Sequence, residues 1–366
     1  MIPRLLYLVS HPIQYQAPLL RLIAADSGLR LRVLFERVDT VAGYHDPGFG
    51  THVRWDVPLR DGYDSTALAE TDLAAEIAAA DVIWLHGWAS PTMRRTLRLA
   101  ARLGKPVLMR AENWDGAMPD GIGPRGWLKR LYLRWIFARC RGFLAIGSAN
   151  GAYYRRFGIN DDRIFAVPYA VDNDFFAAQA ARADTASLRH ALGIEPEQQV
   201  ILYAGKFQRR KHPEQVVAAW KSLPQPRPAL LMVGNGEMRA QLEAMAEPGM
   251  IFAGFRNQTQ LPAFYALADV FVLPSEHEPW GLAVNEAMAC GTAVVVSDQV
   301  GAAFDLVDDS TGAVFAAGDT AALTTSLVRV LEQSQIRGQA AASRIATWDF
   351  RADLAGLHKA VAHVLG

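Results

Sequence analysis

The sequence of 366 residues has few cysteines and no excess of charge of either sign. Its two cysteines, Cys140 and Cys290, lie far apart and outside any C-x-x-C spacing, which argues against a disulfide framework or a cysteine zinc site and favours a reducing cytoplasm. Lys and Arg together number 37, as do Asp and Glu, so no overall field attracts polyanions. We therefore expect no nucleic-acid partner.

Long apolar runs are also missing. The first such run, residues 5–9, is interrupted at His11 and Pro12 and is too short for a signal-peptide core or a membrane-spanning helix. No internal repeat of about 20–50 residues is present. We expect a cytoplasmic protein, either soluble or peripheral on the inner face of the plasma membrane.

The chain contains a rhythm of short β-rich runs separated by helical patterns, which predicts parallel sheets built from βαβ units. The expected strands are 5–9, 31–35, 82–85, 106–109, 143–146 and 164–167 in the first half, and 200–204, 229–233, 250–252, 270–273 and 293–296 in the second. Helix starts are expected at Ser90-Pro91, Ser148, His212-Pro213 and 259–262.

Two Rossmann-like domains follow from this pattern, because 51% hydrophobic residues can fill more than one core. We expect an α/β protein with domains at residues 1–172 and 173–349, joined by a linker within 169–184. A helix at about 350–366 is expected to pack back on the first domain. Classical dinucleotide binding is not expected, because no G-x-G-x-x-G follows the first strand and Gly234-Asn235-Gly236 lacks the third glycine.

The segment 274–291 carries two glutamates, Glu278 and Glu286, around a helix start expected near Gly281. Free backbone N–H groups and the positive end of the helix dipole make such a start an anion site, and glycine lets a ligand approach the backbone. Ionised carboxylates accept hydrogen bonds from hydroxyl groups such as those of a ribose. Taken singly, each glutamate is better interpreted as an acid that stabilises the helix or as a solvated side chain than as a ligand-binding residue.

A second segment, residues 205–211, follows the strand expected at 200–204 and has four cations in six positions, Lys206 to Lys211. Ammonium and guanidinium groups at the end of a strand suit a pyrophosphate. The alternative is a solvated basic turn.

Together these segments resemble the C-terminal domain of the family-four retaining glycosyltransferases of GT-B architecture. The resemblance depends on the Glu278-x7-Glu286 spacing around Pro279-Trp280-Gly281, the loop Gly205-Lys206-x4-Lys211, the run Val233-Gly234-Asn235-Gly236, and Ala289-Cys290-Gly291-Thr292. It is close over about residues 198–320 and looser in the first half. It implies two Rossmann-like domains with a deep cleft between them, a nucleotide-diphosphate sugar on the second domain and an acceptor on the first.

The resemblance also assigns roles by motif. Lys206 and Lys211 would grip the diphosphate, and Glu278 would bind hydroxyls of the donor sugar. Glu286 would hold the ribose. The further donor-binding residues expected are Gly205, Gly234, Phe255, Arg256, Pro279, Trp280, Gly281 and Leu282. The sequence departs from the usual pattern at Lys206, where arginine is common, at Trp280, where phenylalanine is, and in Pro168-Tyr169-Ala170-Val171-Asp172.

In the first half, His86 ends the strand expected at 82–85, where ligands of open α/β sheets bind. Similar enzymes place a histidine near the donor sugar at this position, although a lone histidine is often structural. The expected catalytic residues are His86, Lys206, Lys211 and Glu278. The expected acceptor-binding residues are His11, Gln14, Tyr15, Trp88, Arg110, Glu112 and Asn113.

The resemblance implies transfer of a sugar from a UDP- or GDP-linked donor to a hydroxyl of a glycan or lipid-linked acceptor, in the synthesis of cell-surface polysaccharide or glycoconjugates. It implies retention of configuration, and neither a cofactor nor a metal. A GT-B epimerase or hydrolase and a non-catalytic sugar-binding protein are the alternatives. A metal-dependent GT-A transferase would need an Asp-x-Asp motif, and Asp172-Asn173-Asp174 is interpreted instead as turn chemistry.

The run 124–142 has six basic residues and no acid, and Leu128, Leu131, Tyr132 and Trp135 share one helical face. A basic, aromatic, amphipathic helix is typical of binding to an anionic membrane. The alternative is that the apolar residues pack on the sheet while the cations are solvated.

Overall fold

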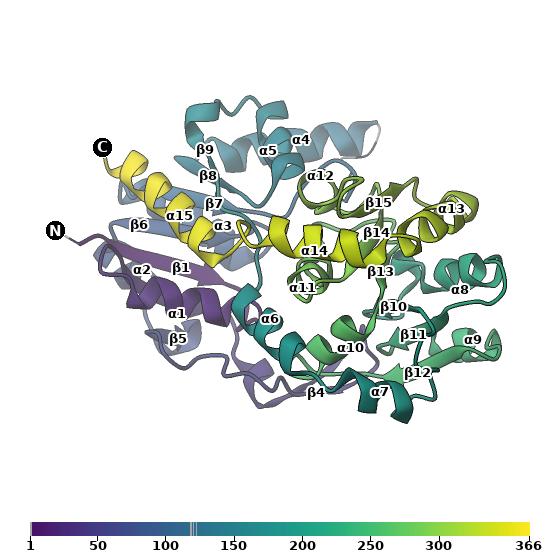
Figure 1. Ribbon diagram of the computed structural model, residues 1–366. Coiled ribbons are helices and arrows are strands. Elements are labelled where there is room, and N and C mark those ends of the chain that lie inside the picture. The colour runs from purple at the N-terminus through teal and green to yellow at the C-terminus, as the bar shows by residue number, and fades with distance from the viewer. Residues whose placement is uncertain (1, 118, 120, 122) are drawn as a thin grey trace. The chain divides into compact units, whose positions relative to one another are not determined.

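The computed structural model describes residues 2–117, 119, 121 and 123–366. The chain divides into two compact units (Figure 1). Unit 1 comprises Met1–Gly43, Pro58–Tyr169 and Phe350–Gly366, and unit 2 comprises Tyr44–Val57 and Ala170–Asp349. The break at Tyr169 lies close to the expected one after residue 172. The assignment of residues 44–57 to unit 2 differs from the expected division, which put all of 1–172 in the first domain.

Unit 1 is built on a seven-stranded parallel sheet of order β5-β2-β1-β6-β7-β8-β9. Its strands are β1 (Arg4–Val9), β2 (Arg30–Phe35), β5 (Ser65–Ala67), β6 (Val82–His86), β7 (Val107–Arg110), β8 (Gly142–Ala145) and β9 (Ile164–Ala166). Its α-helices are α1 (Ala17–Ala25), α2 (Leu73–Ala79), α3 (Pro91–Arg102), α4 (Pro124–Phe137), α5 (Ser148–Arg156) and α15 (Phe350–Leu365). Short 3-10 helices are η1 (Asp39–Ala42), η2 (Leu68–Glu70) and η3 (Asp161–Arg163).

Unit 2 has a six-stranded parallel sheet of order β12-β11-β10-β13-β14-β15 and the antiparallel pair β3 (Tyr44–Asp46) and β4 (Thr51–Val53). Its other strands are β10 (Val200–Ala204), β11 (Ala229–Val233), β12 (Met250–Gly254), β13 (Val270–Leu273), β14 (Ala293–Ser297) and β15 (Gly312–Phe315). Its helices are α6 (Asn173–Arg182), α7 (Thr185–Ala191), η4 (Arg209–Lys211), α8 (Pro213–Lys221), α9 (Arg239–Ala244), α10 (Leu261–Leu267), α11 (Leu282–Ala289), α12 (Ala303–Leu306), α13 (Thr320–Leu331) and α14 (Ser334–Ile345).

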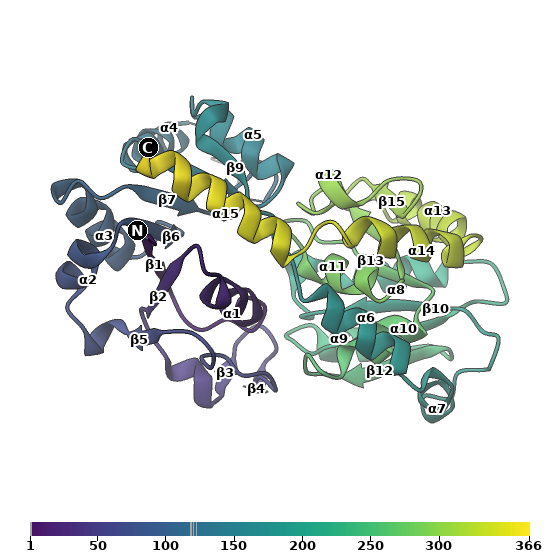
Figure 2. The same cartoon turned by 60° about the vertical axis from the view of Figure 1, so that its left-hand side comes forward.

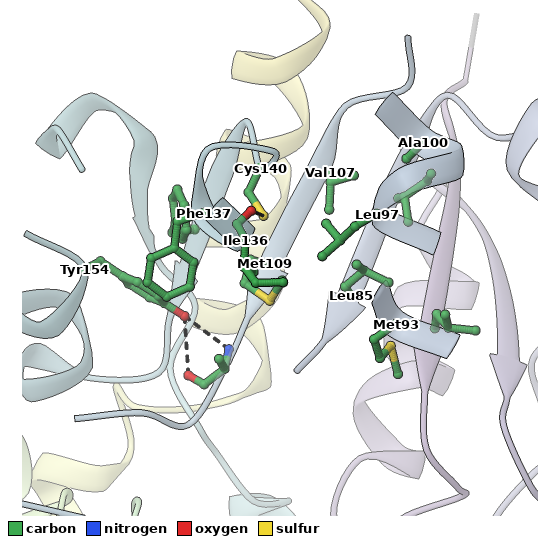
Figure 3. Packing of buried hydrophobic residues seen from close by; sticks show 14 of the residues in the cluster. Leu85, Met93, Leu97, Ala100, Val107, Met109, Ile136, Phe137, Cys140 and Tyr154 are labelled. Atoms are coloured by element: carbon green, nitrogen blue, oxygen red, sulfur yellow. Dashed lines mark hydrogen bonds between the residues drawn. The ribbon is translucent and has the colours of Figure 1, made fainter. Parts of the chain in front are cut away.

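The strand cores are apolar and buried on both faces, as parallel sheets covered by helices require. All five residues of β10, β11 and β14 are buried. In unit 1, Figure 3 shows Leu85 and Met109 of the sheet packed among Met93 and Leu97 of α3 and Phe137 of α4. Each unit therefore has a hydrophobic core of its own.

The predicted strands and helix starts are confirmed. Ser90 caps α3 by accepting a hydrogen bond of 3.1 Å from the Met93 amide, with Pro91 at the first helical position. The expected linker was wrong in one respect, because most of it forms α6. That helix starts where the Asp172 carboxylate accepts a 3.0 Å hydrogen bond from the Phe175 amide. The carboxylate of Asp172 therefore serves a helix cap, in agreement with the interpretation of the Asp-x-Asp motif as local backbone chemistry.

Helix α15 lies against β8 and β9 of the unit 1 sheet (Figure 2). A buried ion pair holds it there. Arg110, the last residue of β7, lies 2.8 Å from the Asp353 carboxylate of α15, and the two side chains are 2% and 1% exposed. The guanidinium also donates to the Val167 carbonyl at 3.1 Å and lies over the Tyr169 ring, 4.6 Å from its centroid. Burial raises the pKa of Asp353, while Arg110 opposes that rise. The ion pair thus links helix α15 to strand β7 of the unit 1 sheet.

We expect Asp353→Ala to destabilise unit 1 by about 3–5 kcal/mol, because it leaves the Arg110 guanidinium buried without a counter-charge. The measurement is urea unfolding of the full chain. The double variant Arg110→Met, Asp353→Leu is the control, since replacing both charges with apolar groups removes the unpaired charge. A loss under about 1 kcal/mol for Asp353→Ala, as for an exposed pair, would contradict this role.

Candidate functional site

The candidate residues of unit 2 follow three neighbouring strands of its sheet. The loop with Lys206 and Lys211 follows β10, Gly234 follows β11, and Glu278 lies in the loop between β13 and α11. Because all these strands are parallel, their carboxyl ends meet at the same edge of the sheet, where ligands of open α/β sheets bind. The strand order changes direction between β10 and β13, which is the topological switch point of this sheet.

Lys211 and Glu278, predicted to lie in one site, form an ion pair. Their side chains are 15% and 11% exposed, so solvent screens the pair only in part. Glu278 is further held by the Ser275 hydroxyl at 3.3 Å, and its backbone amide donates to the Gln299 carbonyl at 3.1 Å. The loop after β10 and the segment before α11 are therefore joined by opposite charges, with the Glu278 carboxylate held beside the Lys211 ammonium.

Helix α11 begins beside this pair, as predicted. Gly281, the N-cap, has φ 96° and ψ 60°, which is left-handed backbone that favours glycine. A Cβ there would also lie 3.0 Å from side-chain carbons of both Leu273 and Val300. Gly281 has no side chain with which to cap α11, and a helix start of this kind suits an anion.

The ring of the neighbouring Trp280, which stands where phenylalanine is common, is buried. Its indole is 3% exposed and stacks on Trp348, with ring centroids 5.4 Å apart and planes 9° apart. The indole N–H donates to Asn285 at 2.8 Å. The ring is therefore packed inside unit 2 and held there by Trp348 and Asn285.

Glu286 lies on α11 and is half-buried. Burial raises the pKa of this carboxyl to about 7, although a 2.8 Å hydrogen bond from the Tyr265 hydroxyl lowers it. Such a carboxyl changes protonation near neutral pH, and a perturbed pKa of this kind is frequent at functional sites.

Glycines make the β10 and β11 loops meet closely. The Gly205 amide donates to the Val233 carbonyl at 2.9 Å, and a Cβ at Gly234, whose φ is 140°, would collide with the Gly205 carbonyl oxygen. Phe255 follows β12 and meets the Phe49 ring edge-on at 4.8 Å. The Arg256 guanidinium lies over the Phe264 ring, 5.4 Å from its centroid.

Lys206 was expected to act with Lys211, but it has a different partner. Its ammonium lies 3.0 Å from both carboxylate oxygens of Asp46 in the β3–β4 hairpin. Sequence reasoning did not single out Asp46. The run Asp46-Pro47-Gly48 is a turn signal between Tyr44 and Val53 that could have indicated the hairpin, although not its partner.

In unit 1, His86 is the centre of a hydrogen-bonded group. Its Nδ1 is 2.7 Å from the Tyr7 hydroxyl, and its Nε2 is 2.9 Å from the Tyr169 hydroxyl and 3.6 Å from the Glu112 carboxylate. The Nδ1 is also 3.3 Å from the Gln16 amide nitrogen. Burial raises the pKa of Glu112, but hydrogen bonding and charge from His86 outweigh it and hold this pKa below its usual range.

Tyr7, Gln16 and Tyr169 are contacts of His86 that the sequence did not indicate. Tyr169 lies in the Pro-Tyr-Ala-Val-Asp departure from the family pattern, and its hydroxyl also donates to Glu112. That departure therefore supplies a hydroxyl between His86 and Glu112. Tyr7 and Gln16 are joined by a 2.8 Å hydrogen bond, and both are buried.

The other predicted residues of unit 1 have separate surroundings. Tyr15 meets Tyr169 edge-on at 5.9 Å, next to His86. Trp88 donates to the buried Asn113 at 3.3 Å, and the His11 ring bonds with Ser10 at 2.8 Å. Arg110 is buried in its ion pair with Asp353, so its position does not support contact with an acceptor. Gln14, like Tyr15, is half-buried in the loop before α1.

Helix α4 leaves large apolar side chains exposed. Trp127, Leu128, Leu131 and Trp135 are 56%, 58%, 41% and 37% exposed, while Leu133, Ile136 and Phe137 pack into the core. The alternative that Leu128, Leu131 and Trp135 pack on the sheet is therefore wrong. Across the part of the chain that the structure describes, no helix combines the length and the apolar character needed to cross a membrane.

Two family models match the chain. Residues 14–170 match a glycosyl transferase 4-like domain, and residues 184–344 match the glycosyl transferases group 1. HepE of Anabaena, solved in complex with UDP, superposes with a TM-score of 0.74 at 16% identity over 98% of this chain and 99% of that one. This likeness shows the fold, which is GT-B. The chain belongs to the group 1, family-four glycosyltransferases.

Curated relatives are similar over part of their length. A D-inositol 3-phosphate glycosyltransferase of Xylanimonas cellulosilytica is 33% identical over 53% of this chain and 50% of its own. A 2-deoxystreptamine glucosyltransferase of Streptomyces kanamyceticus is 32% identical over 62% of this chain and 60% of its own. The matched regions thus span about half to three fifths of these two relatives.

We expect Glu286→Gln to stabilise the protein at pH 8 but much less at pH 5. A carboxyl with a folded-state pKa of about 7 and an unfolded one near ~4.3 loses stability as pH rises through that interval. The neutral amide avoids this loss, which we put on the order of 1–2 kcal/mol because the side chain is only half-buried.

Urea unfolding at both pH values measures the difference. Glu332, exposed at the end of α13, is the matched control, because Glu332→Gln removes the same charge at the surface. An equal effect of Glu286→Gln at pH 5 and pH 8 would show that its carboxyl is not perturbed.

Proposed function

We propose that the protein transfers a sugar from a nucleotide-diphosphate donor, UDP- or GDP-linked, to a hydroxyl of a glycan or lipid-linked acceptor in the synthesis of cell-surface polysaccharide or glycoconjugates. The observation that carries this proposal is the meeting of Lys211, Glu278 and the start of α11 at one edge of the unit 2 sheet. Cations and the amides of a helix start suit a diphosphate, and fixed carboxylates suit sugar and ribose hydroxyls.

In the proposed donor site, Lys206, Lys211 and the amides of Gly281 and Leu282 bind the diphosphate. Glu278 accepts hydrogen bonds from the donor sugar and Glu286 from the ribose. The half-buried position of Glu286 supports a ribose contact, because a ligand there would complete its shielding from water. The match to HepE, which was solved with UDP, also supports a UDP-linked donor.

We propose that transfer retains the anomeric configuration and needs neither a metal nor a covalent enzyme intermediate. The bond from the anomeric carbon to the leaving phosphate oxygen breaks while the acceptor oxygen bonds to the same face. The acceptor's proton passes to the phosphate. Lys206, Lys211 and the α11 amides stabilise the negative charge of the leaving group, which is the role a metal would otherwise take. We also propose that His86 is catalytic and that His11, Gln14 and Tyr15 contribute to acceptor binding.

The exposed face of α4 supports a second element of the proposal, which is peripheral binding to an anionic membrane. Trp127 and Trp135 would enter the interface, and Arg130 and Arg134 would meet lipid phosphates. Each cation near such a surface contributes about 1 kcal/mol. A lipid-linked acceptor would be reached from this position.

We expect transfer to proceed in EDTA and to give a product whose linkage has the donor's anomeric configuration by NMR. Lys211→Ala should lower kcat/KM by about 100-fold, because it removes a leaving-group cation, and Lys206→Ala should also lower it. Lys221→Ala is the matched control, since Lys221 pairs with Glu247 at 2.9 Å at the end of α8.

An inverted product, or activity that manganese alone restores, would overturn this mechanism. Full activity of Lys211→Ala would overturn the donor site. Hydrolysis of the nucleotide sugar without transfer to any acceptor would favour the hydrolase alternative.

We expect Arg130→Glu, Arg134→Glu to reduce binding to vesicles of anionic phospholipid by about tenfold or more, because two attractive charges become repulsive. The matched control is Arg98→Glu, Arg102→Glu, which makes the same charge change on α3, where Leu97 is buried. Co-sedimentation with vesicles at fixed ionic strength is the measurement. Equal binding by both double variants would exclude α4 as the membrane contact.

A further inference from the structure

The hairpin of β3 and β4 belongs to unit 2, although the sequence on both sides of it belongs to unit 1. Its strands pair antiparallel, with Tyr44 opposite Val53 and Asp46 opposite Thr51. The turn between them, Asp46-Pro47-Gly48-Phe49-Gly50, lies on the loop that follows β10. A Cβ at Gly48 would come within 2.6 Å of the Lys206 side chain, so the turn and the lysine are in direct contact.

The carboxylate of Asp46 is held in a nest of donors. Besides Lys206, it accepts hydrogen bonds from the amides of Gly48 at 2.7 Å and Phe49 at 3.0 Å and from the Tyr44 hydroxyl at 2.9 Å. Its side chain is 6% exposed. Burial raises the pKa of Asp46, but the hydrogen bonds from Lys206 and the Phe49 amide outweigh it and hold this pKa below its usual range. Asp46 is therefore a fixed anion on a lysine of the proposed donor site.

Other hairpin contacts reach the neighbouring loops of the same sheet edge. Phe49 packs against Phe255, Arg54 accepts a 2.6 Å hydrogen bond from Asn257 through its carbonyl, and Asp56 accepts a 3.2 Å hydrogen bond from the Thr259 amide. On the β11 side, a Cβ at Gly236 would lie 2.9 Å from the Gly48 carbonyl oxygen. The hairpin thus spans the loops after β10, β11 and β12.

We propose that Asp46 is an internal competitor for the donor's diphosphate, and that the β3–β4 hairpin sets donor affinity by holding this carboxylate on Lys206. The inference rests on the proposed function, because it takes Lys206 as a phosphate ligand. One ammonium cannot give its full charge to a carboxylate and to a phosphate together. A bound diphosphate therefore displaces the Asp46 carboxylate from Lys206, and the turn 46–50 loses its contact with that lysine.

The competition has a defined effect on affinity. If the paired state of Lys206 dominates, only the small unpaired fraction binds the diphosphate with its intrinsic affinity, and the observed dissociation constant is larger by the inverse of that fraction. The dissociation constant is raised for every compound that carries the diphosphate, whichever base or sugar it has. Removing the competing charge therefore tightens binding of every nucleoside diphosphate.

The test is Asp46→Asn in the full chain, with UDP, GDP and inorganic pyrophosphate as probes in isothermal titration. The amide keeps an oxygen that can accept from the Gly48 and Phe49 amides, so the turn retains its hydrogen bonds while the charge is lost. We expect the tighter-binding nucleotide to gain about tenfold in affinity, corresponding to a paired state favoured by about ten to one. Pyrophosphate should gain by a similar factor.

Asp56→Asn is the matched control, because it removes the same charge from the other end of the hairpin and does not touch Lys206. It should leave nucleotide affinity within about twofold of the parent, as expected for a distant surface charge. A second measurement uses the unmutated protein. Amide hydrogen exchange of residues 44–57 should speed up when the nucleotide binds, while exchange of residues 205–211 slows.

Unchanged or weaker binding by Asp46→Asn would overturn the inference and leave the donor site intact, since the unmutated protein would still bind. An equal gain in Asp56→Asn would also overturn it, because loosening of the hairpin would then explain the result. Slower exchange of residues 44–57 with bound nucleotide would identify the hairpin as a clamp and refute displacement. If none of the three probes binds either protein, the donor site itself is wrong, and the inference falls with it.

Discussion

The parallel direction of the strands is the constraint on which the rest of this structure depends. In a parallel sheet every strand must be followed by a crossover, and all carboxyl ends lie at one edge. The loops of unit 2 that carry Lys206, Gly234 and Glu278 are adjacent for this reason, although up to about seventy residues separate them. The local chemistry then follows from glycines and charges, such as the left-handed Gly281 before α11 and the ion pair of Lys211 with Glu278.

The sequence was sufficient for the repeating part of the fold. Strands such as β10 and β14 are continuous apolar runs, and helix starts such as Ser90-Pro91 have side-chain chemistry of their own, so both are readable from a few neighbouring residues. The short strands β3, β4 and β5 were missed because two of the three residues in each are polar, whereas the equally short β9 is apolar and was predicted. Strand β15 was missed as well. Helix α6 was interpreted as a linker, since its alanines carry no strong pattern.

Partners distant in sequence account for most of what could not be predicted about the site. From the sequence, Arg110 is a polar residue at the end of a strand. Its burial depends on the ion pair with Asp353, which lies 243 positions later. Lys206 has a partner 160 positions earlier in Asp46. Trp280 lies in a functional motif, yet its ring stacks on Trp348. The motif fixed the backbone of this segment, while packing decided where its side chains point.

The position of α15 has a consequence for the order in which the protein can be assembled. Leu357 and Val361 of this helix are buried in the same cluster as Tyr7 and Val33, so unit 1 is completed by residues that are synthesised after unit 2. Between Tyr169 and Phe350 the ribosome adds the segment Ala170–Asp349, which at ~5–20 residues per second takes roughly 10–40 seconds. During that time the strip of sheet that α15 covers stays bare on the nascent chain. Unit 2 is therefore completed before unit 1, although most of unit 1 precedes it in the sequence.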